Sequence, residues 1–148
     1  MLSMVRLTPE QISVMWDAFK HGILIAMQQA PENSDLVLSH MLRDLMCEDA
    51  QCWLLSEVEE GEREVLGFGT TRIVRDTVTG VQSLNIITIN AFRTLSSEMY
   101  YKAVNVLTHY ARAGGCSGLT LQASGQRAKE LAEHAGFKCV SENYLLEV

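Results

Sequence analysis

The chain has 148 residues, 47% of them hydrophobic and 20% charged, so it can bury a sizeable core and is predicted to form one domain over residues 1–148. Its net charge of -6 argues against nucleic acid or an anionic membrane surface as a partner, since proteins that bind them present basic surfaces. No stretch approaches the roughly 20 apolar residues of a membrane span, and we expect a cytoplasmic protein whose partners are small molecules or proteins.

The first part of the chain carries the sequence signals of two helices. Residues 8–29 carry apolar side chains at helical spacing, and Thr8, Pro9 and Gln11 match a capping box with proline at the first helical position. Residues 30–34 break this helix. Ser34 is expected to cap a second amphipathic helix.

Three strands are expected next, at residues 52–58, 64–75 and 81–92. The connections between them are polar and contain glycine, which is typical of hairpin turns. The natural arrangement is therefore an antiparallel meander.

The remaining residues alternate between helix and strand. A helix is predicted from Ser96 or Ser97 to about Arg112, followed by a short strand within residues 117–123. Ser124 is expected to cap a last helix, residues 125–135, and residues 137–148 are expected to supply one or two closing strands. The predicted class is α/β (α+β), a mixed and mostly antiparallel sheet flanked by about four helices.

The four cysteines lack the close paired spacing of zinc ligands or of a disulfide scaffold. The four histidines are each without a companion ligand in the sequence. No metal is therefore expected.

This element order resembles the GNAT superfamily of acyl-CoA-dependent N-acyltransferases over essentially the whole chain. The most specific segment is the last helix, where Ala128, Gly136 and Phe137 match the family pattern N-x-x-A-x-x-x-Y-x-x-x-G-F. The resemblance implies a GNAT-like fold, acetyl-CoA as the co-substrate, and transfer of the acetyl group to an amine on a small molecule or protein.

The resemblance also places a coenzyme A site before the core helix. In the family a loop of the form R/Q-x-x-G-x-G/A binds the pyrophosphate through backbone N–H groups and the helix N-terminus. Arg93 matches the first position, but Ser96 and Glu98 stand where small residues belong, so this loop is degenerate. The expected contacts are Arg93, Leu95, Ser96 and Ser97.

The resemblance further implies that backbone groups of Ile89 and Asn90 hold the pantetheine. The family's usual acid, a tyrosine in the last helix, is replaced by Ala132, and Gly125 replaces the asparagine that opens that segment. Tyr144, in the expected closing strand, is the candidate for the missing acid. Two functions stay open: an N-acetyltransferase, and an inactive module that uses the same scaffold for binding or structure. The Met-rich, Trp-bearing helices leave a homodimer open.

Overall fold

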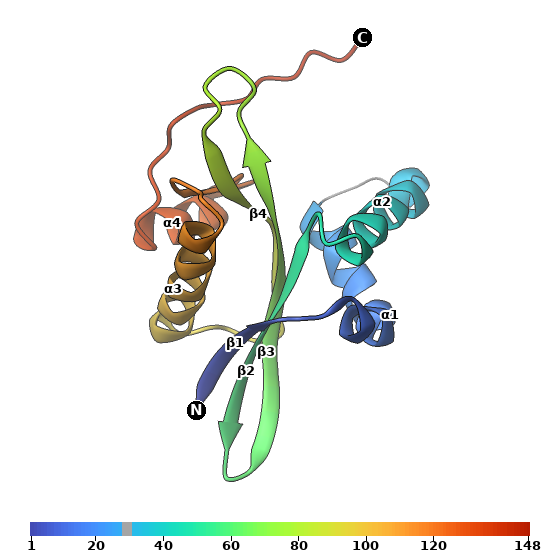
Figure 1. The fold of residues 1–148 in the computed structure, drawn as a ribbon, viewed down its shortest axis with the longest axis vertical. Coiled ribbons are helices and arrows are strands. Elements are labelled where there is room, and N and C mark those ends of the chain that lie inside the picture. The colour runs from blue at the N-terminus through green and yellow to red at the C-terminus, as the bar shows by residue number, and fades with distance from the viewer. Residues whose placement is uncertain (28–30) are drawn as a thin grey trace.

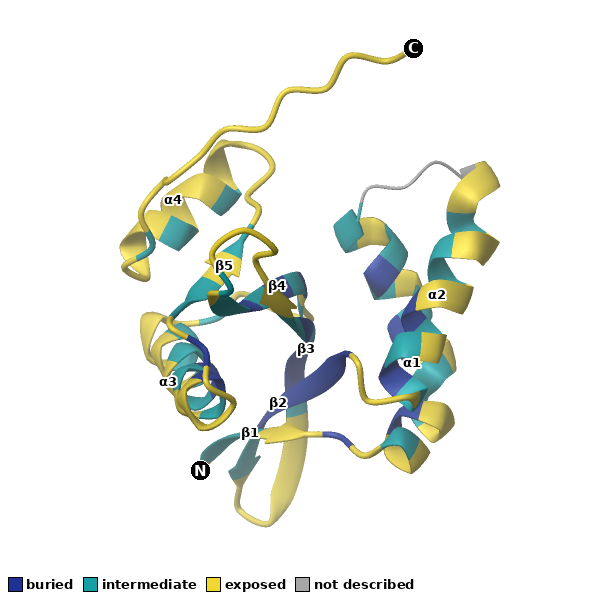
Figure 2. Cartoon of the chain, turned by 45° about the horizontal axis from the view of Figure 1, so that its top comes forward, coloured by how far each residue is buried: buried dark blue, intermediate teal, exposed yellow. Residues whose placement is uncertain are grey.

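The computed structural model describes residues 1–27 and 31–148, which form a twisted sheet with helices on both faces (Figures 1 and 2). The strands are β1 (Leu2–Arg6), β2 (Gln51–Glu59), β3 (Glu62–Arg75), β4 (Gln82–Ala91) and β5 (Leu119–Leu121). They lie in chain order across the sheet; β1 to β4 are antiparallel to their neighbours, and β5 runs parallel to β4. No helix among these residues is long and apolar enough to cross a membrane.

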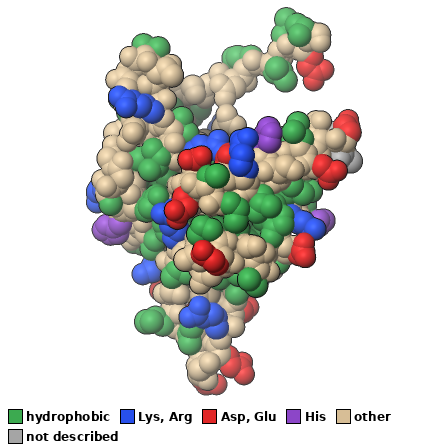
Figure 3. All heavy atoms as spheres, turned by 45° about the vertical axis from the view of Figure 1, so that its right-hand side comes forward, with side chains coloured by type: hydrophobic (Ala, Val, Ile, Leu, Met, Phe, Trp, Pro, Cys, Tyr) green, Lys and Arg blue, Asp and Glu red, His purple; other side chains and the backbone are tan. Residues whose placement is uncertain are grey.

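Helices cover the two faces in pairs. On one side lie α1 (Pro9–Met27) and α2 (Ser34–Met46), the latter preceded by the 3-10 turn η1 (Pro31–Asn33); α3 (Ser97–Ala113) and α4 (Gln126–His134) lie on the other (Figure 1). Figure 3 brings the α1–α2 side forward and shows hydrophobic side chains mixed with charges of both signs. That view shows no large surface of a single charge.

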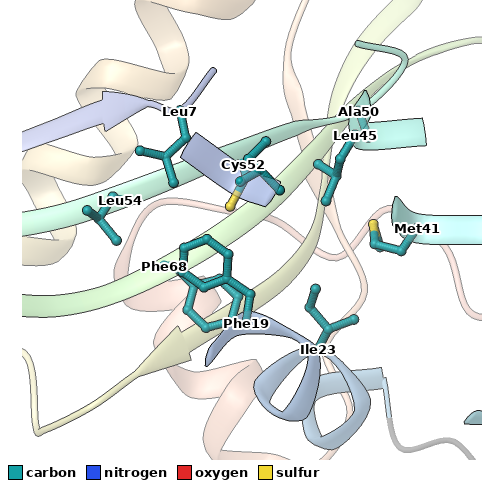
Figure 4. Close-up of a cluster of buried hydrophobic side chains, with 10 residues drawn as sticks. Leu7, Phe19, Ile23, Met41, Leu45, Ala50, Cys52, Leu54 and Phe68 are labelled. Atoms are coloured by element: carbon teal, nitrogen blue, oxygen red, sulfur yellow. The ribbon is translucent and has the colours of Figure 1, made fainter. Parts of the chain in front are cut away.

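The core between the sheet and helices α1 and α2 is built from aromatic and branched side chains (Figure 4). Phe19 of α1 and Phe68 of β3 lie at its centre, with ring centroids 4.5 Å apart. Such a pair contributes packing energy beyond the area that it buries. The buried members are Leu7, Ile12, Phe19, Ile23, Met41, Leu45, Ala50, Cys52, Leu54 and Phe68.

A second core lies between the sheet and α3, around Trp53, Leu84 and Leu107. Trp53 also belongs to a buried polar chain. Its Nε1 donates to the Thr71 hydroxyl at 2.9 Å, and that hydroxyl donates to Gln51 Oε1 at 2.8 Å. Because burying an unpaired polar group is costly, this chain fixes the tryptophan ring in one orientation.

The predicted fold class is confirmed, and so is the meander of strands β2 to β4. The capping box is present in both directions: the Gln11 N–H donates to the Thr8 hydroxyl at 3.2 Å, and the Thr8 N–H donates to Gln11 Oε1 at 2.8 Å. Ser96 caps α3 by accepting from the Met99 N–H at 3.3 Å. Gly115, with φ of 78°, follows the end of that helix as its left-handed residue.

Four sequence expectations need correction or fall outside the description. Strand β1 was not predicted from the sequence; it is held by antiparallel pairing with β2. Ser34 is the first residue of α2 rather than its cap, since the capping position is Asn33, and Gly125 rather than Ser124 precedes α4. Residues 28–29 of the first predicted helix lie outside the described residues.

The expected closing strands are the largest correction. Residues 138–148 contain no strand and are exposed along their whole length. A strand needs a neighbour to satisfy its backbone groups, and this segment pairs with no strand in the described part of the chain.

Candidate active site

The site begins where β4 and β5 separate. The two strands pair only over Leu84–Ile86 and Leu119–Leu121, and β4 then continues to Ala91 without β5 beside it. In the pairing with β3, Thr70 lies opposite Thr88 and Thr71 opposite Ile86, so Ile87 is an extra residue. This bulge redirects β4 and leaves one backbone edge unpaired beyond it.

The direction of the backbone groups along this edge follows from two observations. The Phe92 N–H donates to the Leu66 carbonyl of β3 at 2.9 Å, and a Cβ placed on Gly67 of β3 would overlap the Asn90 carbonyl oxygen. Residues 92 and 90 therefore turn their backbone groups toward β3. Since the direction alternates along a strand, Ile89 turns its N–H and carbonyl toward the open edge.

A cavity of about 490 Å³ follows the open edge and extends to both faces of the sheet. On one face it lies between α3 and α4, and on the other it reaches the end of α1 at Ile25 and Ala26. Its walls are mostly apolar, with the following residues of the two flanking helices: Tyr100, Ala103, Val104, Leu107, Arg127, Ala128, Leu131 and Ala132. Such a passage can hold a long ligand on one face and a second reactant on the other.

Two glycines of β3 leave part of the sheet side of this cavity without side chains. Gly67 and Gly69 of β3 lie opposite Ala91 and Ile89 of β4, and both glycines line the cavity. A side chain at Gly67 would collide with backbone, so the close approach of β3 and β4 requires glycine there. The sheet thus presents main chain rather than side chains to a ligand.

The polar groups on the α1 face of the cavity are hydroxyls and an amide. Thr70 and Thr88 are buried and share a hydrogen bond of 2.7 Å between their hydroxyls. Asn90 Nδ2 donates to the Gly22 carbonyl of α1 at 2.8 Å, while its Oδ1 is buried without a hydrogen-bond partner among the described residues. A free buried acceptor beside a cavity can receive a hydrogen bond from a ligand N–H or O–H.

The structure brings some of the expected cofactor contacts to the cavity and leaves others away from it. Ile89, Asn90 and Leu95 line it. Ser96 and Ser97 are not part of the lining; the first is used as the cap of α3 and the second is its first residue.

Arg93 is also outside the lining. Its guanidinium lies 3.4 Å from a Glu57 carboxylate oxygen of β2 and 3.6 Å from one of Glu64 of β3. Two acidic neighbours already offset its charge, although the side chain is 46% exposed. The arrangement does not offer Arg93 as a free cation for a phosphate.

Tyr144 is not brought to the site. It lies in the strandless segment after α4, 89% exposed, with its hydroxyl donating to the Glu142 carboxylate at 2.8 Å. The tyrosine that lines the cavity is Tyr100, on the first turn of α3. Tyr100 was not among the candidate residues predicted from the sequence.

Sequence reasoning also missed Ser124 and Arg127, which line the cavity from the start of α4. Arg127 is the one charged residue of the lining in the part of the chain that the structure describes, and no ion pair involves it there. Its neighbour Ala128 belongs to the segment that carried the family resemblance. The position of Arg127 next to Ala128 was the sequence signal that could have identified it as a site residue.

The cysteines and acidic residues add no further chemistry to the site. Burial raises the pKa of the Cys52 thiol to about 12, so this side chain is a neutral core residue at physiological pH. Among the described residues, no group of three or more His, Cys, Asp or Glu side chains could hold a metal ion.

Comparison of the sequence finds no matching family model and no matching curated protein. Comparison of the structure finds many acetyltransferases. A predicted acetyltransferase from Clostridium acetobutylicum, solved with acetyl-CoA, gives a TM-score of 0.72 at 14% identity, over 99% of this chain and 96% of that chain. An aminoglycoside N-acetyltransferase in complex with CoA gives 0.71 at 12% identity, over 100% and 95%.

A ribosomal-protein-alanine N-acetyltransferase from Brucella melitensis gives a TM-score of 0.65 at 20% identity, over 100% of both chains. These likenesses extend over nearly the full length of each protein. At such low identity they show that the chain has the GNAT-like fold.

Proposed function

We propose that this GNAT-fold chain is an N-acetyltransferase that binds acetyl-CoA along the open edge of β4 and transfers the acetyl group to an amine. The observation that carries the proposal is the bulge at Ile87, beyond which Ile89 offers an unpaired N–H and carbonyl to the cavity. A pantetheine arm has amide groups of its own, so it can pair with such an edge as an added strand would. The solved structures described above are acetyltransferases and give no support to an inactive module.

The reaction requires few side chains. The amine nitrogen attacks the thioester carbonyl carbon, the carbonyl oxygen gains negative charge, and the C–S bond then breaks to release the CoA thiolate. A fixed backbone N–H at the open edge, such as that of Ile89, can donate to the oxygen as its charge develops. The amine loses one proton and the thiolate takes one up, and water that enters the open groove can carry both.

Holding the two reactants together supplies much of the acceleration. The cavity reaches both faces of the sheet, so the thioester can lie between α3 and α4 while the amine enters from the α1 face. Fixing the attacking atom next to the carbonyl replaces an encounter in solution with an intramolecular step. Asn90 Oδ1 is placed to accept a hydrogen bond from the acceptor substrate on that face.

The CoA phosphates require a cation, and Arg127 is better placed than Arg93 to supply one. Arg127 lines the groove without an ionic partner among the described residues, whereas Arg93 lies between two glutamates. A hydrogen bond to a charged group contributes about 1.5–3 kcal/mol, which corresponds to roughly a 10- to 100-fold change in affinity. We therefore assign the phosphate contact to Arg127.

Calorimetric titration with CoA and acetyl-CoA tests this assignment. We expect binding to the wild-type chain, a loss of about tenfold or more in Arg127→Ala, and a small change in the matched control Arg93→Ala. If Arg93→Ala weakens binding as much as Arg127→Ala, the assignment of the phosphate contact is wrong. Absence of binding to the wild-type chain at millimolar CoA would refute the proposed function itself.

Thioester loss in the presence of a panel of amines then tests catalysis. We expect at least one small amine or peptide N-terminus to be acetylated. A Tyr100→Phe variant then distinguishes proton transfer by the Tyr100 phenol from proton transfer by water. A chain that binds acetyl-CoA but acetylates no member of a broad panel would limit the function to binding.

A further inference from the structure

A depression lies in the sheet under α3, where β3 carries two glycines. Gly69 pairs with Trp53 of β2, which belongs to the core between the sheet and α3, so a side chain at position 69 would point toward α3. Gly67 lies two residues earlier in the same strand and faces the same way. Opposite these two positions β2 carries Trp53 and Leu55. A strand without side chains beside a strand with large ones leaves a trough.

Helix α3 does not fill this trough. A Cβ built on Gly69 would meet one heavy atom within 4 Å among the described residues, apart from its chain neighbours: the Thr88 carbonyl oxygen at 3.0 Å. That oxygen belongs to β4, so no described atom of α3 packs onto the strand at this point. Because protein interiors are close-packed, a gap of this kind means that the helix stands off the sheet here. The space belongs to the cavity of about 490 Å³, which both glycines line.

The walls of the trough are apolar and shielded from water. On the sheet side they are Trp53 and Leu55 of β2 and Met4 of β1, and on the helix side they include Val104 and Leu107 of α3. Trp53, Leu55 and Leu107 are each at most 6% exposed. A hollow with such walls offers few hydrogen bonds to water or to a polar ligand, and it favours a hydrocarbon.

The trough connects with the open edge of β4. Ala91 of β4 pairs with Gly67 and lines the same cavity, and its short side chain leaves a path across β4 from the open edge. Neighbouring strands lie about 4.8 Å apart, so the path from that edge over β3 to β2 is about 10 Å long. An extended hydrocarbon chain advances about 1.3 Å per carbon, so about six to eight carbons fill the path.

We propose, given the acyl transfer proposed above, that the trough holds the acyl chain of the CoA thioester and that the preferred donor carries about six to eight carbons. Acetyl-CoA is then the shortest donor that the site accepts. The bond changes are those of acetyl transfer. The amine nitrogen bonds to the thioester carbon, the C–S bond breaks, and the proton that the amine loses balances the one that the thiolate takes up.

The trough lies on the donor's side of the sheet. It opens under α3, on the face where the groove between α3 and α4 receives the thioester in the proposed function, whereas the acceptor amine enters from the α1 face. A chain that starts at a carbonyl held by the Ile89 N–H reaches the trough without crossing the sheet. An apolar tail on the acceptor would have to pass through the place of the thioester.

Calorimetric titration of the whole chain with a series of CoA thioesters tests the proposal. The series is acetyl-, butyryl-, hexanoyl-, octanoyl- and dodecanoyl-CoA. Each added methylene should tighten binding about fourfold until the chain exceeds the trough, so hexanoyl-CoA should bind about 100-fold or more tightly than acetyl-CoA. Between octanoyl- and dodecanoyl-CoA the gain should stop.

A variant that fills the trough separates this effect from nonspecific binding of hydrocarbon. Ala103 lines the cavity from α3, two helical turns before Tyr110, whose ring packs edge-on against Trp53 with centroids 5.1 Å apart. Ala103→Leu therefore adds branched carbons over the trough, and the gain per methylene should disappear. Ala113→Leu makes the same change at the exposed last residue of α3 and should keep the gain.

Two outcomes would overturn the inference while acetyl-CoA still binds. The first is a dissociation constant that does not fall with acyl length in the wild-type chain, or that falls equally in Ala103→Leu. The second is a KM for linear alkylamines, measured with acetyl-CoA, that falls with amine length and loses this dependence in Ala103→Leu, since the trough would then hold the acceptor. Absence of binding by every thioester would refute the proposed function and this inference together. If Ala103→Leu does not fold, the wild-type series still decides.

Discussion

Thr71 joins two buried side chains beneath the candidate site, and its replacement by valine should be among the costliest isosteric changes in this protein. The hydroxyl accepts from Trp53 Nε1 and donates to Gln51 Oε1, and all three residues are 4% exposed or less. Thr71→Val keeps the volume but leaves one donor and one acceptor buried without partners. At about 1–3 kcal/mol for each unsatisfied group, we expect a loss of about 2–6 kcal/mol.

Urea denaturation followed by circular dichroism measures this loss. With a slope of about 2 kcal/mol per molar, a loss of 3 kcal/mol lowers the midpoint by about 1.5 M. Thr71→Ser keeps the hydroxyl and serves as the matched control, with a smaller loss from the missing methyl group. The indole N–H resonance of Trp53 should also shift in Thr71→Val, while that of Trp16, the only other tryptophan, should not. Equal stability of the two variants would refute the reasoning.

Three further predictions concern the backbone, a helix cap and a thiol. Gly67→Ala should lower the melting temperature, because its Cβ would overlap the Asn90 carbonyl oxygen. Gly118→Ala, with open space around it, is the control and should leave the melting temperature nearly unchanged. Equal effects of the two variants would contradict the predicted collision. Thr8→Ala should cost about 1 kcal/mol in urea denaturation through loss of the capping box, and Thr8→Ser should restore most of it. With a thiol reagent at pH 8, only the exposed Cys47 and Cys139 should react in the folded chain. Cys52 and Cys116 are buried, and burial raises the pKa of Cys52 to about 12. Rapid modification of Cys52 before unfolding would show that its burial is wrong.

Several features could be predicted from the sequence because they depend on neighbours a few residues apart. The capping box at Thr8 and Gln11 spans three residues, and the Ser96 cap of α3 reaches only to Met99. The runs of β-branched residues in β3 and β4 likewise indicate strands. The order of these elements was enough to suggest the fold.

The candidate site depended on partners that are distant in the sequence. Arg93 matches a family position, but Glu57 and Glu64, some thirty residues earlier, engage its guanidinium. Arg127 carries no motif of its own and becomes a candidate only because α4 places it in the groove. No local pattern shows which of two arginines has acidic neighbours.

The sequence by itself determined the capping box of α1 and the three-stranded meander. Only the tertiary structure decided that β4 leaves β5 after the bulge at Ile87, which opens the edge at Ile89, and that Tyr144 lies away from the cavity. The physical reason is the range of the interactions. Caps and side-chain alternation are complete within one element, whereas an open strand edge and an ion pair exist only where separate elements meet.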